Sequence, residues 1–351
     1  MSLPTVIGYA AKGAGQALER FTYDSPKLNE HDIRVSITHC GICYSDIMGI
    51  DNTYDIVTFP FVPGHEIVGT VSDLGNQVTE FKEGDQVGIG WQGRSCMQCE
   101  YCLQGEEQLC VDIDNDVTWT PYGGFATSVV VDSRFAYSLP AAMSPENAAV
   151  LMCAGLSVYS PLRMYASGGQ CKVGIIGVGG LGHLAIQFAH ALGCEVTAFS
   201  STPEKKDQAI IFGADHFIHM QDKASMKQVR YSQDLLLYTG HTDIDWLTLL
   251  YRLRPNGRLV MVGISESPVT FEPLEVVAHQ WSITGSCLGN HKIMREMLRL
   301  AQEKRITPMV ELLPMSQVND AISKVRHNQA RYRMVLVNDL DEVQSPRMPA
   351  R

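Results

Sequence analysis

The chain has 351 residues, of which 45% are hydrophobic and 19% are charged, and its net charge is −10. This composition is that of an ordinary globular protein long enough for two domains. The acidic balance and the lack of a basic cluster disfavour nucleic acid and anionic membranes as main partners. We find neither an apolar run of about 20 residues nor a basic-then-apolar leader, so we expect a cytoplasmic protein.

The first part of the chain predicts short strands joined by glycine and proline turns, which favours a compact β barrel or a folded sheet. Some of these runs alternate apolar and polar residues, as a strand with one buried face does. The expected strands are Val6–Ala10, Ile33–Thr38, Val68–Leu74, a strand after the turn at Gly84, Phe125–Val131 and Arg134–Leu139.

The pattern changes at Ser144-Pro145-Glu146, where a capping serine, a first-turn proline and an early acid predict a helix start. Beyond it, strands alternate with helices, which indicates βαβ units on a parallel sheet. The expected strands are Lys172–Ile176, Glu195–Phe199, His216–His219, Leu235–Tyr238 and Arg258–Val262, and the expected helices Ser157–Tyr165, Leu181–Leu192 and Glu204–Phe212. We assign a last helix, His291–Glu303, and a last strand, Arg333–Val337, to the first domain. The predicted domains are therefore 1–153 with 289–351, and 154–288.

Four of the ten cysteines lie close together with the spacing C-x2-C-x2-C-x7-C, namely Cys96, Cys99, Cys102 and Cys110. In a reducing compartment, clustered cysteines indicate metal or redox chemistry more often than disulfides. Four thiolates complete a tetrahedral zinc site with no open position, so we expect a structural zinc. The alternatives are four free surface thiols, an iron–sulfur cluster, or a zinc ribbon for nucleic acid, which the acidic balance disfavours.

The segment Gly177-Val178-Gly179-Gly180-Leu181-Gly182 fits the pattern G-x-G-x-x-G between a predicted strand and a predicted helix. In such a turn Gly177 permits the tight bend, Gly179 lets the backbone approach a pyrophosphate, and Gly182 lets the helix pack closely on the strand. The free amides of the helix start face the phosphates. The pattern predicts a dinucleotide site, with a glycine turn that serves packing alone as the alternative.

The end of the next strand indicates which dinucleotide binds. An NAD site usually has an acid there that holds the ribose hydroxyls. Here the strand continues into Ser200-Ser201-Thr202-Pro203-Glu204-Lys205-Lys206, with no acid at its tip. Hydroxyls and an ammonium group suit the 2′-phosphate of NADP, so we favour NADP. Two alternatives are lysines that are merely solvated and a Glu204 that reaches the ribose.

Further motifs occur in one order with the cysteine cluster and the glycine turn: Cys40-Gly41-Ile42-Cys43-Tyr44-Ser45-Asp46, Pro63-Gly64-His65-Glu66 and Cys153. In this combination the chain resembles the zinc-dependent medium-chain alcohol dehydrogenases over nearly its full length. Within them it looks most like the cinnamyl-alcohol-dehydrogenase group, and there like bacterial NADPH-dependent aldehyde reductases. The segments that point to these are Gly88-Ile89-Gly90-Trp91, Ser200-Ser201-Thr202 and Ala330-Arg331-Tyr332-Arg333.

The resemblance implies an α/β protein with a Rossmann doubly wound parallel sheet, a GroES-like β-rich catalytic domain that holds both zincs, and an active site in the cleft between them. It makes Cys43, His65 and Cys153 ligands of a catalytic zinc with an open fourth position. Glu66 lies near this zinc and binds it transiently during ligand exchange. It also implies that the Ser45 hydroxyl passes a proton to the alkoxide and that Asp46 accepts from the other His65 nitrogen.

The resemblance also suggests residues around the cofactor and the substrate. The expected cofactor contacts are Ser157 on the nicotinamide, Arg333 on the phosphates, Val262 and Ser286. The expected substrate pocket comprises Trp91, Trp119, Cys287 and Leu288. Ordinary packing is the alternative for both tryptophans, a helix-turn role for Ser157 and an exposed strand start for Arg333. We interpret Cys40, Cys171, Cys194 and Cys287 as buried small hydrophobic residues.

Two departures from the family bear on function. Tyr44 and Met48 occupy the neighbourhood where many members have a proton-relaying histidine, so the relay would end at the cofactor ribose and water. Cys287 and Leu288 replace a phenylalanine-containing wall of the plant lignin enzymes, which weakens the case for cinnamyl substrates. We expect reversible NADPH-dependent reduction of aldehydes to primary alcohols, two zinc ions per chain and a homodimer. The alternatives are an NAD-dependent secondary-alcohol or polyol dehydrogenase and a catalytically idle NADPH-binding relative.

Overall fold

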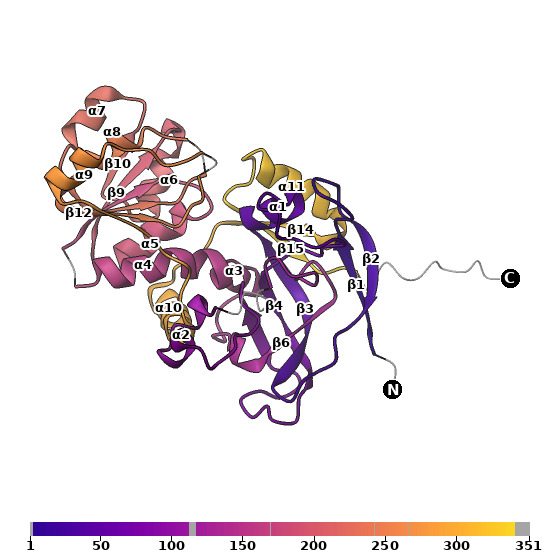
Figure 1. The fold of residues 1–351 in the computed structure, drawn as a ribbon. Helices are drawn as coiled ribbons and strands as arrows, with labels where there is room; N and C mark the ends of the chain where they lie inside the picture. Colours follow the sequence, from indigo (N-terminus) through magenta and orange to yellow (C-terminus); the bar gives the residue numbers. More distant parts are fainter. Residues whose placement is uncertain (1–2, 112–116, 169, 242, 266, 341–351) are drawn as a thin grey trace. The chain divides into compact units, whose positions relative to one another are not determined.

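The computed structural model describes residues 3–111, 117–168, 170–241, 243–265 and 267–340. The chain divides into two compact units, 1–153 with 308–351, and 154–307 (Figure 1). The second boundary lies later than the expected 288/289, because helix α10 (His291–Lys304) packs within the second unit. Its Glu296 accepts hydrogen bonds from Tyr159 at 2.9 Å and from Arg163 at 2.7 Å, both on α4 (Leu156–Ala166).

The second unit contains the doubly wound parallel sheet, six-stranded, in the order β10-β9-β8-β11-β12-β13. The direction of the strand order reverses between β8 and β11. At such a switch point the carboxyl ends of the strands leave a crevice in which ligands bind. The strands are β8 (Lys172–Ile176), β9 (Glu195–Ser200), β10 (His216–His219), β11 (Gln233–Tyr238), β12 (Leu253–Met261) and β13 (Ser282–Gly285).

Helices pack against this sheet. Its central strands are almost wholly apolar, as expected of strands that are covered on both faces. Phe199, Tyr238 and Trp246 are among the largest buried side chains of this core. Besides α4 and α10 the helices of this unit are α5 (Gly182–Ala191), α6 (Lys206–Ile211), α7 (Lys223–Gln228), α8 (Trp246–Leu250) and α9 (Pro273–His279).

The first unit is the β-rich part of the protein. Its larger sheet has the order β14-β15-β3-β4-β5-β7 with β6 paired to β3, and β1 and β2 form a separate antiparallel pair. In the described part of the chain, the β14–β15 pair of these sheets is parallel and the other strand pairs are antiparallel. The strands are β1 (Thr5–Ala10), β2 (Glu19–Asp24), β3 (Asp32–Ile42), β4 (Glu66–Leu74), β5 (Gln86–Ile89), β6 (Ser128–Asp132), β7 (Ala136–Ser138), β14 (Val310–Pro314) and β15 (Arg333–Val337).

Several helices of the first unit lie next to side chains of metal-ligand type. The helices of this unit are α1 (Tyr44–Asp51), α2 (Glu100–Leu103), α3 (Pro145–Val150) and α11 (Val318–Arg326). Cys43 caps α1, His65 directly precedes β4, and Cys153 follows α3 in a π-helical segment, 151–155. Among the described residues, no helix combines the length and the apolar character needed to cross a bilayer.

Candidate functional site

Four side chains of metal-ligand type meet in the first unit: Cys43, His65, Glu66 and Cys153. Each offers one ligand atom, and these atoms all lie within 4.8 Å of one another. The strand register brings them together, since Gly41 pairs with Glu66 across β3 and β4, just before Cys43 in the chain. Sulfur, nitrogen and carboxylate oxygen are the donors that zinc takes in proteins, so the cluster fits a zinc ion.

Asp46 holds His65 in one orientation. It is fully buried in the first turn of α1, and its Oδ1 lies 2.9 Å from His65 Nδ1. Its two oxygens also accept the backbone N–H groups of Gly64, at 2.9 Å, and Cys43, at 2.8 Å. With Nδ1 donating to the carboxylate, Nε2 carries the free lone pair that binds a metal. The predicted contact between Asp46 and His65 is therefore present.

Glu66 is paired with Arg333, which stands at the start of β15. Arg333 Nη2 donates to Glu66 Oε1, and both side chains are buried. The other oxygen, Oε2, is buried without a hydrogen-bond partner, as expected of an oxygen that a metal would use. Gly41 leaves room for it, because a Cβ there would lie 2.1 Å from Oε2. The structure thus places Arg333 against Glu66, and its contact with cofactor phosphates remains a prediction.

The charges and hydrogen bonds of the cluster favour the thiolate form of Cys43. A hydrogen bond from Cys153 lowers the pKa of Cys43 well below its ordinary value, and the same bond raises the pKa of Cys153. Burial opposes a charge on His65, but the charge and hydrogen bond of Asp46 outweigh it and raise its pKa. Burial raises the pKa of Glu66 to about 7, although the positive charge of Arg333 acts against it. A thiolate is the form in which cysteine binds zinc.

Ser45, on α1, lies beside the cluster, and Trp119, from a later segment of the chain, packs against the same helix. The Oγ of Ser45 is 3.7 Å from the Sγ of Cys43, and Trp119 Nε1 donates to the carbonyl of Ser45 at 3.3 Å. The indole rests on the helix, since a Cβ on Gly49 would lie 3.1 Å from it. Trp91 is half-buried on the segment after β5, and its carbonyl accepts from the hydroxyl of Thr118.

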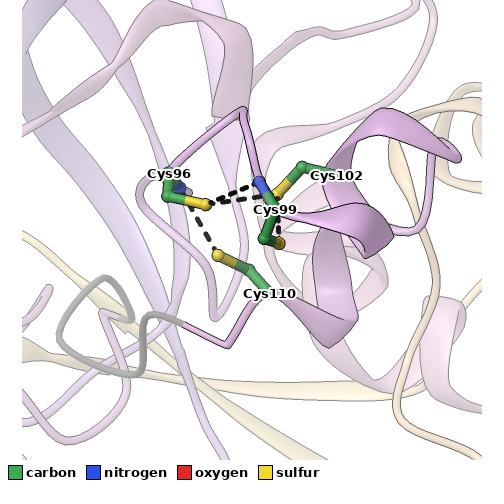
Figure 2. Close-up of side chains that lie close together, drawn as sticks. All are labelled: Cys96, Cys99, Cys102 and Cys110. Atoms are coloured by element: carbon green, nitrogen blue, oxygen red, sulfur yellow. Dashed lines mark hydrogen bonds between the residues drawn. The ribbon is translucent and has the colours of Figure 1, made fainter.

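The four-cysteine lobe gathers its sulfurs as predicted (Figure 2). The Sγ of Cys102 lies 3.9 Å from that of Cys96 and 3.5 Å from that of Cys99. A tetrahedral zinc with bonds of about 2.3 Å requires sulfurs about 3.8 Å apart, which these separations match. The Sγ of Cys110 accepts the backbone N–H of Cys96, so it faces the same point. Hydrogen bonds from the backbone of Cys102 and Val111 lower the pKa of Cys99 to about 6.

The glycine turn joins β8 to α5 in the geometry that a phosphate cradle needs. Gly177 has a φ of +93°, which side chains disfavour. A Cβ on Gly182 would lie 1.9 Å from the carbonyl oxygen of Gly177, so only glycine allows this approach. A Cβ on Gly179 would meet no heavy atom within 4 Å, which leaves space above the turn for a ligand. These residues fit a dinucleotide.

The tip of β9 presents hydroxyls and an ammonium group. Ser200 is buried, and its Oγ accepts the N–H of Thr202 at 3.0 Å, which closes the turn. Ser201 and Thr202 are exposed. Lys205 Nζ donates to the carbonyl of Val178 at 2.7 Å, so the tip reaches the glycine turn. Burial lowers the pKa of Lys205.

The remaining expected residues of the second unit lie in different elements. The backbone N–H of Val262 donates to Tyr238, and that of Ser286 donates to Met261, each at 3.1 Å. Ser157 is buried on α4. Leu288 is half-buried with a φ of +41°. Of the cysteines expected to be buried, Cys40 and Cys194 are, whereas Cys171 is half-buried and Cys287 is exposed.

Two features of the site escape sequence reasoning. Gly41 provides space for Glu66, and an isolated glycine in a strand, where a close approach is common, is a signal that could have found it. The pairing of Glu66 with Arg333 joins residues 267 positions apart, and a single sequence carries no signal for it.

Two family models match the chain. The alcohol dehydrogenase GroES-like domain covers residues 29–141, and the zinc-binding dehydrogenase domain covers residues 180–303. The first match holds the Cys43, His65 and Glu66 donors and the cysteine lobe, and the second begins within the glycine turn.

Similar proteins span nearly the whole chain. A probable formaldehyde dehydrogenase of Bacillus subtilis is 39% identical, over 91% of this chain and 93% of its own. A cinnamyl alcohol dehydrogenase of Sorghum bicolor has a solved structure that is 35% identical, with a TM-score of 0.91 over 95% of this chain and 98% of its own. The structure of the CAD from Helicobacter pylori, complexed with NADP(H), is 28% identical, with a TM-score of 0.88 over 96% and 99% of the two chains.

Proposed function

Because this chain belongs to the zinc-dependent medium-chain alcohol dehydrogenases, in the cinnamyl-alcohol-dehydrogenase group, we propose that it reduces aldehydes to primary alcohols with NADPH. The observation that carries this proposal is that the half-buried Cys43 meets the buried His65, Glu66 and Cys153, with their ligand atoms within 4.8 Å of one another. An alcohol dehydrogenase that had lost catalysis would have no reason to keep a complete donor set with an oriented histidine. The names of the similar proteins, formaldehyde and cinnamyl alcohol dehydrogenases, support a small aldehyde or alcohol as substrate.

The residues of the cluster have distinct parts in this reaction. A bound zinc supplies a Lewis acid for the carbonyl oxygen, and bound NADPH supplies the hydride. The thiolates of Cys43 and Cys153 would offset the charge of a bound metal, and Asp46 keeps Nε2 of His65 available for it. The Ser45 hydroxyl would pass a proton to the substrate oxygen as it becomes an alcohol, and would take one in turn from the cofactor ribose and water. Arg333 holds Glu66 close enough to serve as a fourth donor when substrate is absent.

The preference for NADPH rests on the tip of β9. Exposed hydroxyls at Ser201 and Thr202, together with Lys205, would bind a 2′-phosphate, and an acid is missing from this tip. The complex of the Helicobacter pylori protein with NADP(H) supports the same choice. The lobe of Cys96, Cys99, Cys102 and Cys110 would hold a second, structural zinc.

The test is a rate comparison. Purified protein should oxidise NADPH in the presence of a panel of aliphatic, aromatic and branched aldehydes, with a kcat/KM at least about tenfold above that with NADH. Ser201→Asp should shift the preference towards NADH, because its carboxylate repels the 2′-phosphate. Elemental analysis should find about two zinc ions per chain. Absence of turnover across the panel, with zinc and NADPH both bound, would support an idle relative instead.

We also propose that the protein forms a homodimer through its second unit. We propose as well that it is located in a reducing cytoplasm. Strand β13 is an edge of the six-stranded sheet, and α9 directly before it has Leu274 and Val277 each 73% exposed. An open edge beside apolar side chains suits a second copy of the same surface. All ten cysteines are outside disulfides, as a reducing compartment requires. Light scattering should give twice the mass of the chain, and a monomer would contradict the pairing.

A further inference from the structure

Helices α7 and α8 of the second unit flank a pocket of about 610 Å³. The pocket is separate from the glycine turn and the β9 tip, since none of those residues lines it. Its lining joins four cations and one acid to an aromatic ring: Lys223, Lys227, Arg230, Arg252, Asp245 and Tyr251. In a chain with a net charge of −10, this local excess of positive charge calls for a physical reason.

Arg252 is the unusual member of this lining. Its side chain is buried, with 6% of the residue exposed, yet its Nε and Nη1 have no hydrogen-bond partner. Within the described part of the chain no ion pair engages it. Burial lowers the pKa of Arg252, and the nearby charge of Arg230 lowers it further. A guanidinium nevertheless stays charged in proteins, so its burial without a partner is unfavourable unless an anion binds it.

The cations around Arg252 outnumber the single acid of the lining. The Arg230 guanidinium lies over the rings of Tyr231 and Tyr251, at 4.8 and 4.6 Å from their centres. Lys223 and Lys227 are exposed on α7, at the rim. The acid of the lining, Asp245, is already engaged, since it accepts from the backbone N–H and the hydroxyl of Thr248 at 3.0 and 2.7 Å.

We propose that this pocket binds a small organic molecule that carries a phosphate group, with Arg252 as the main contact of the phosphate. The planar guanidinium matches two oxygens of a phosphate, and the surrounding lysines and Arg230 suit its two negative charges. The pocket is much larger than one phosphate ion and falls in the size range of small-molecule sites. The half-buried Met220 and the part of Tyr251 that Arg230 leaves uncovered offer apolar surface for the organic part of the ligand.

The experiment measures binding of phenyl phosphate to the protein saturated with NADPH, so that the cofactor phosphate site is filled. Calorimetry and thermal unfolding are run at constant ionic strength, and the reference sample contains chloride in place of phenyl phosphate. Phenyl phosphate should bind saturably and raise the unfolding temperature of the wild type. Arg252→Met should weaken the binding at least about tenfold, the loss expected for a charged hydrogen bond. Without the ligand this variant should unfold at the same temperature as the wild type or higher, because an unpaired buried charge is gone.

Arg254→Met is the matched control, two residues further along the chain. Arg254 is paired with Asp234 at 2.9 Å, so its loss should lower stability and leave the response to phenyl phosphate intact. If Arg252→Met fails to fold, the exposed variants Lys223→Gln and Lys227→Gln should each weaken binding about threefold. A wild type that does not respond, or responds only when NADPH is absent, would overturn the proposal. Equal binding by all variants would overturn it as well.

Discussion

The first unit contains two clusters of four metal donors that are built in opposite ways. The lobe of Cys96, Cys99, Cys102 and Cys110 draws all four donors from one short segment, whose own backbone amides donate to the sulfurs. The buried cluster draws Cys43, His65, Glu66 and Cys153 from three separate places along the chain. It also depends on Asp46, on Arg333 and on the space left by Gly41.

The difference supports the proposal that the lobe is a structural site and the buried cluster a reactive one. Four thiolates form a closed set in which no donor can leave without loss of the metal. In the buried cluster one donor is the carboxylate of Glu66. Arg333 is a second partner that can hold this carboxylate when it leaves the metal. A position that can be vacated is what a substrate oxygen needs. The lobe should therefore affect stability, and the buried cluster should affect turnover.

The largest expected effect is that of Cys43→Ala. Removal of a ligand to the reactive metal should lower kcat/KM by roughly 10³-fold or more, ~4 kcal/mol of transition-state stabilisation. Zinc content should fall from about two ions per chain to about one. The matched control is Cys40→Ala, a buried thiol three residues earlier outside the cluster, which should keep both zincs and most activity. Equal losses in the two variants would contradict the assignment of Cys43 as a ligand.

Arg333→Met should have the next largest effect, on stability. It leaves the Glu66 carboxylate buried without its counter-charge, which should cost about 3 kcal/mol in the free energy of unfolding. Urea unfolding measures this change. The double variant with Glu66→Gln should recover most of the loss, because no buried charge then remains. The exposed neighbour serves as control: Arg331→Met should stay within about 0.5 kcal/mol of the wild type. A double variant less stable than Arg333→Met would argue against the pair.

The sequence predicts the lobe better than the buried cluster because the lobe is local. A fixed spacing of cysteines within one loop implies its own geometry, and the structure gathers those sulfurs as expected. The donor types of the buried cluster and the support of His65 by Asp46 are also predicted, through the family resemblance, but the roles of Arg333 and Gly41 beside Glu66 are not. Arg333 meets Glu66 only because β15 and β4 both flank β3 in the sheet, which no local pattern encodes.

The same distinction holds for the fold. The strands of the second unit are apolar and regularly spaced, so the pattern of βαβ units identifies the Rossmann sheet. The short helices α7 and α8 escape prediction, since six and five residues are too few for a clear period. In the first unit the edge strand β2 exposes most of its residues and carries little apolar signal. Helix α10 is predicted correctly, but its partner Arg163 could not be known, so it is assigned to the other domain.

Cys110→Ser tests the lobe as the closed counterpart of the buried cluster. Loss of one thiolate should release the structural zinc and destabilise the first unit by ~2 kcal/mol, seen as a lower unfolding temperature. The activity of the folded fraction should stay within about twofold, and elemental analysis should again find about one zinc. Cys171→Ser, a half-buried cysteine outside both clusters, should keep both zincs and serves as control. A large fall in kcat with unchanged stability would mean that the lobe is part of the reactive site.

Gly41→Ala should have the smallest effect, because it displaces one donor without removing it. The backbone of Gly41 has no positive φ, so alanine is strained only by its surroundings. Its Cβ would lie 2.1 Å from Glu66 Oε2 and 2.9 Å from the Glu66 Cβ. We expect a stability loss of ~1–2 kcal/mol from this overpacking and an activity loss of about tenfold. Gly13→Ala is the control. Its new Cβ would lie nearest the movable end of the Gln16 side chain, so neither the stability nor the activity should change.

The variant Gly41→Ala also shows whether the carboxylate or the strand causes the effect. Combined with Glu66→Asp, whose shorter side chain withdraws the oxygen from the new methyl group, it should lose less stability than it does alone. If the loss is unchanged, it comes from the β3–β4 contact at the Glu66 Cβ, and the carboxylate is free to move. In that case the position of the fourth donor would not depend on the strand, and the buried cluster would resemble the lobe more closely than its burial implies.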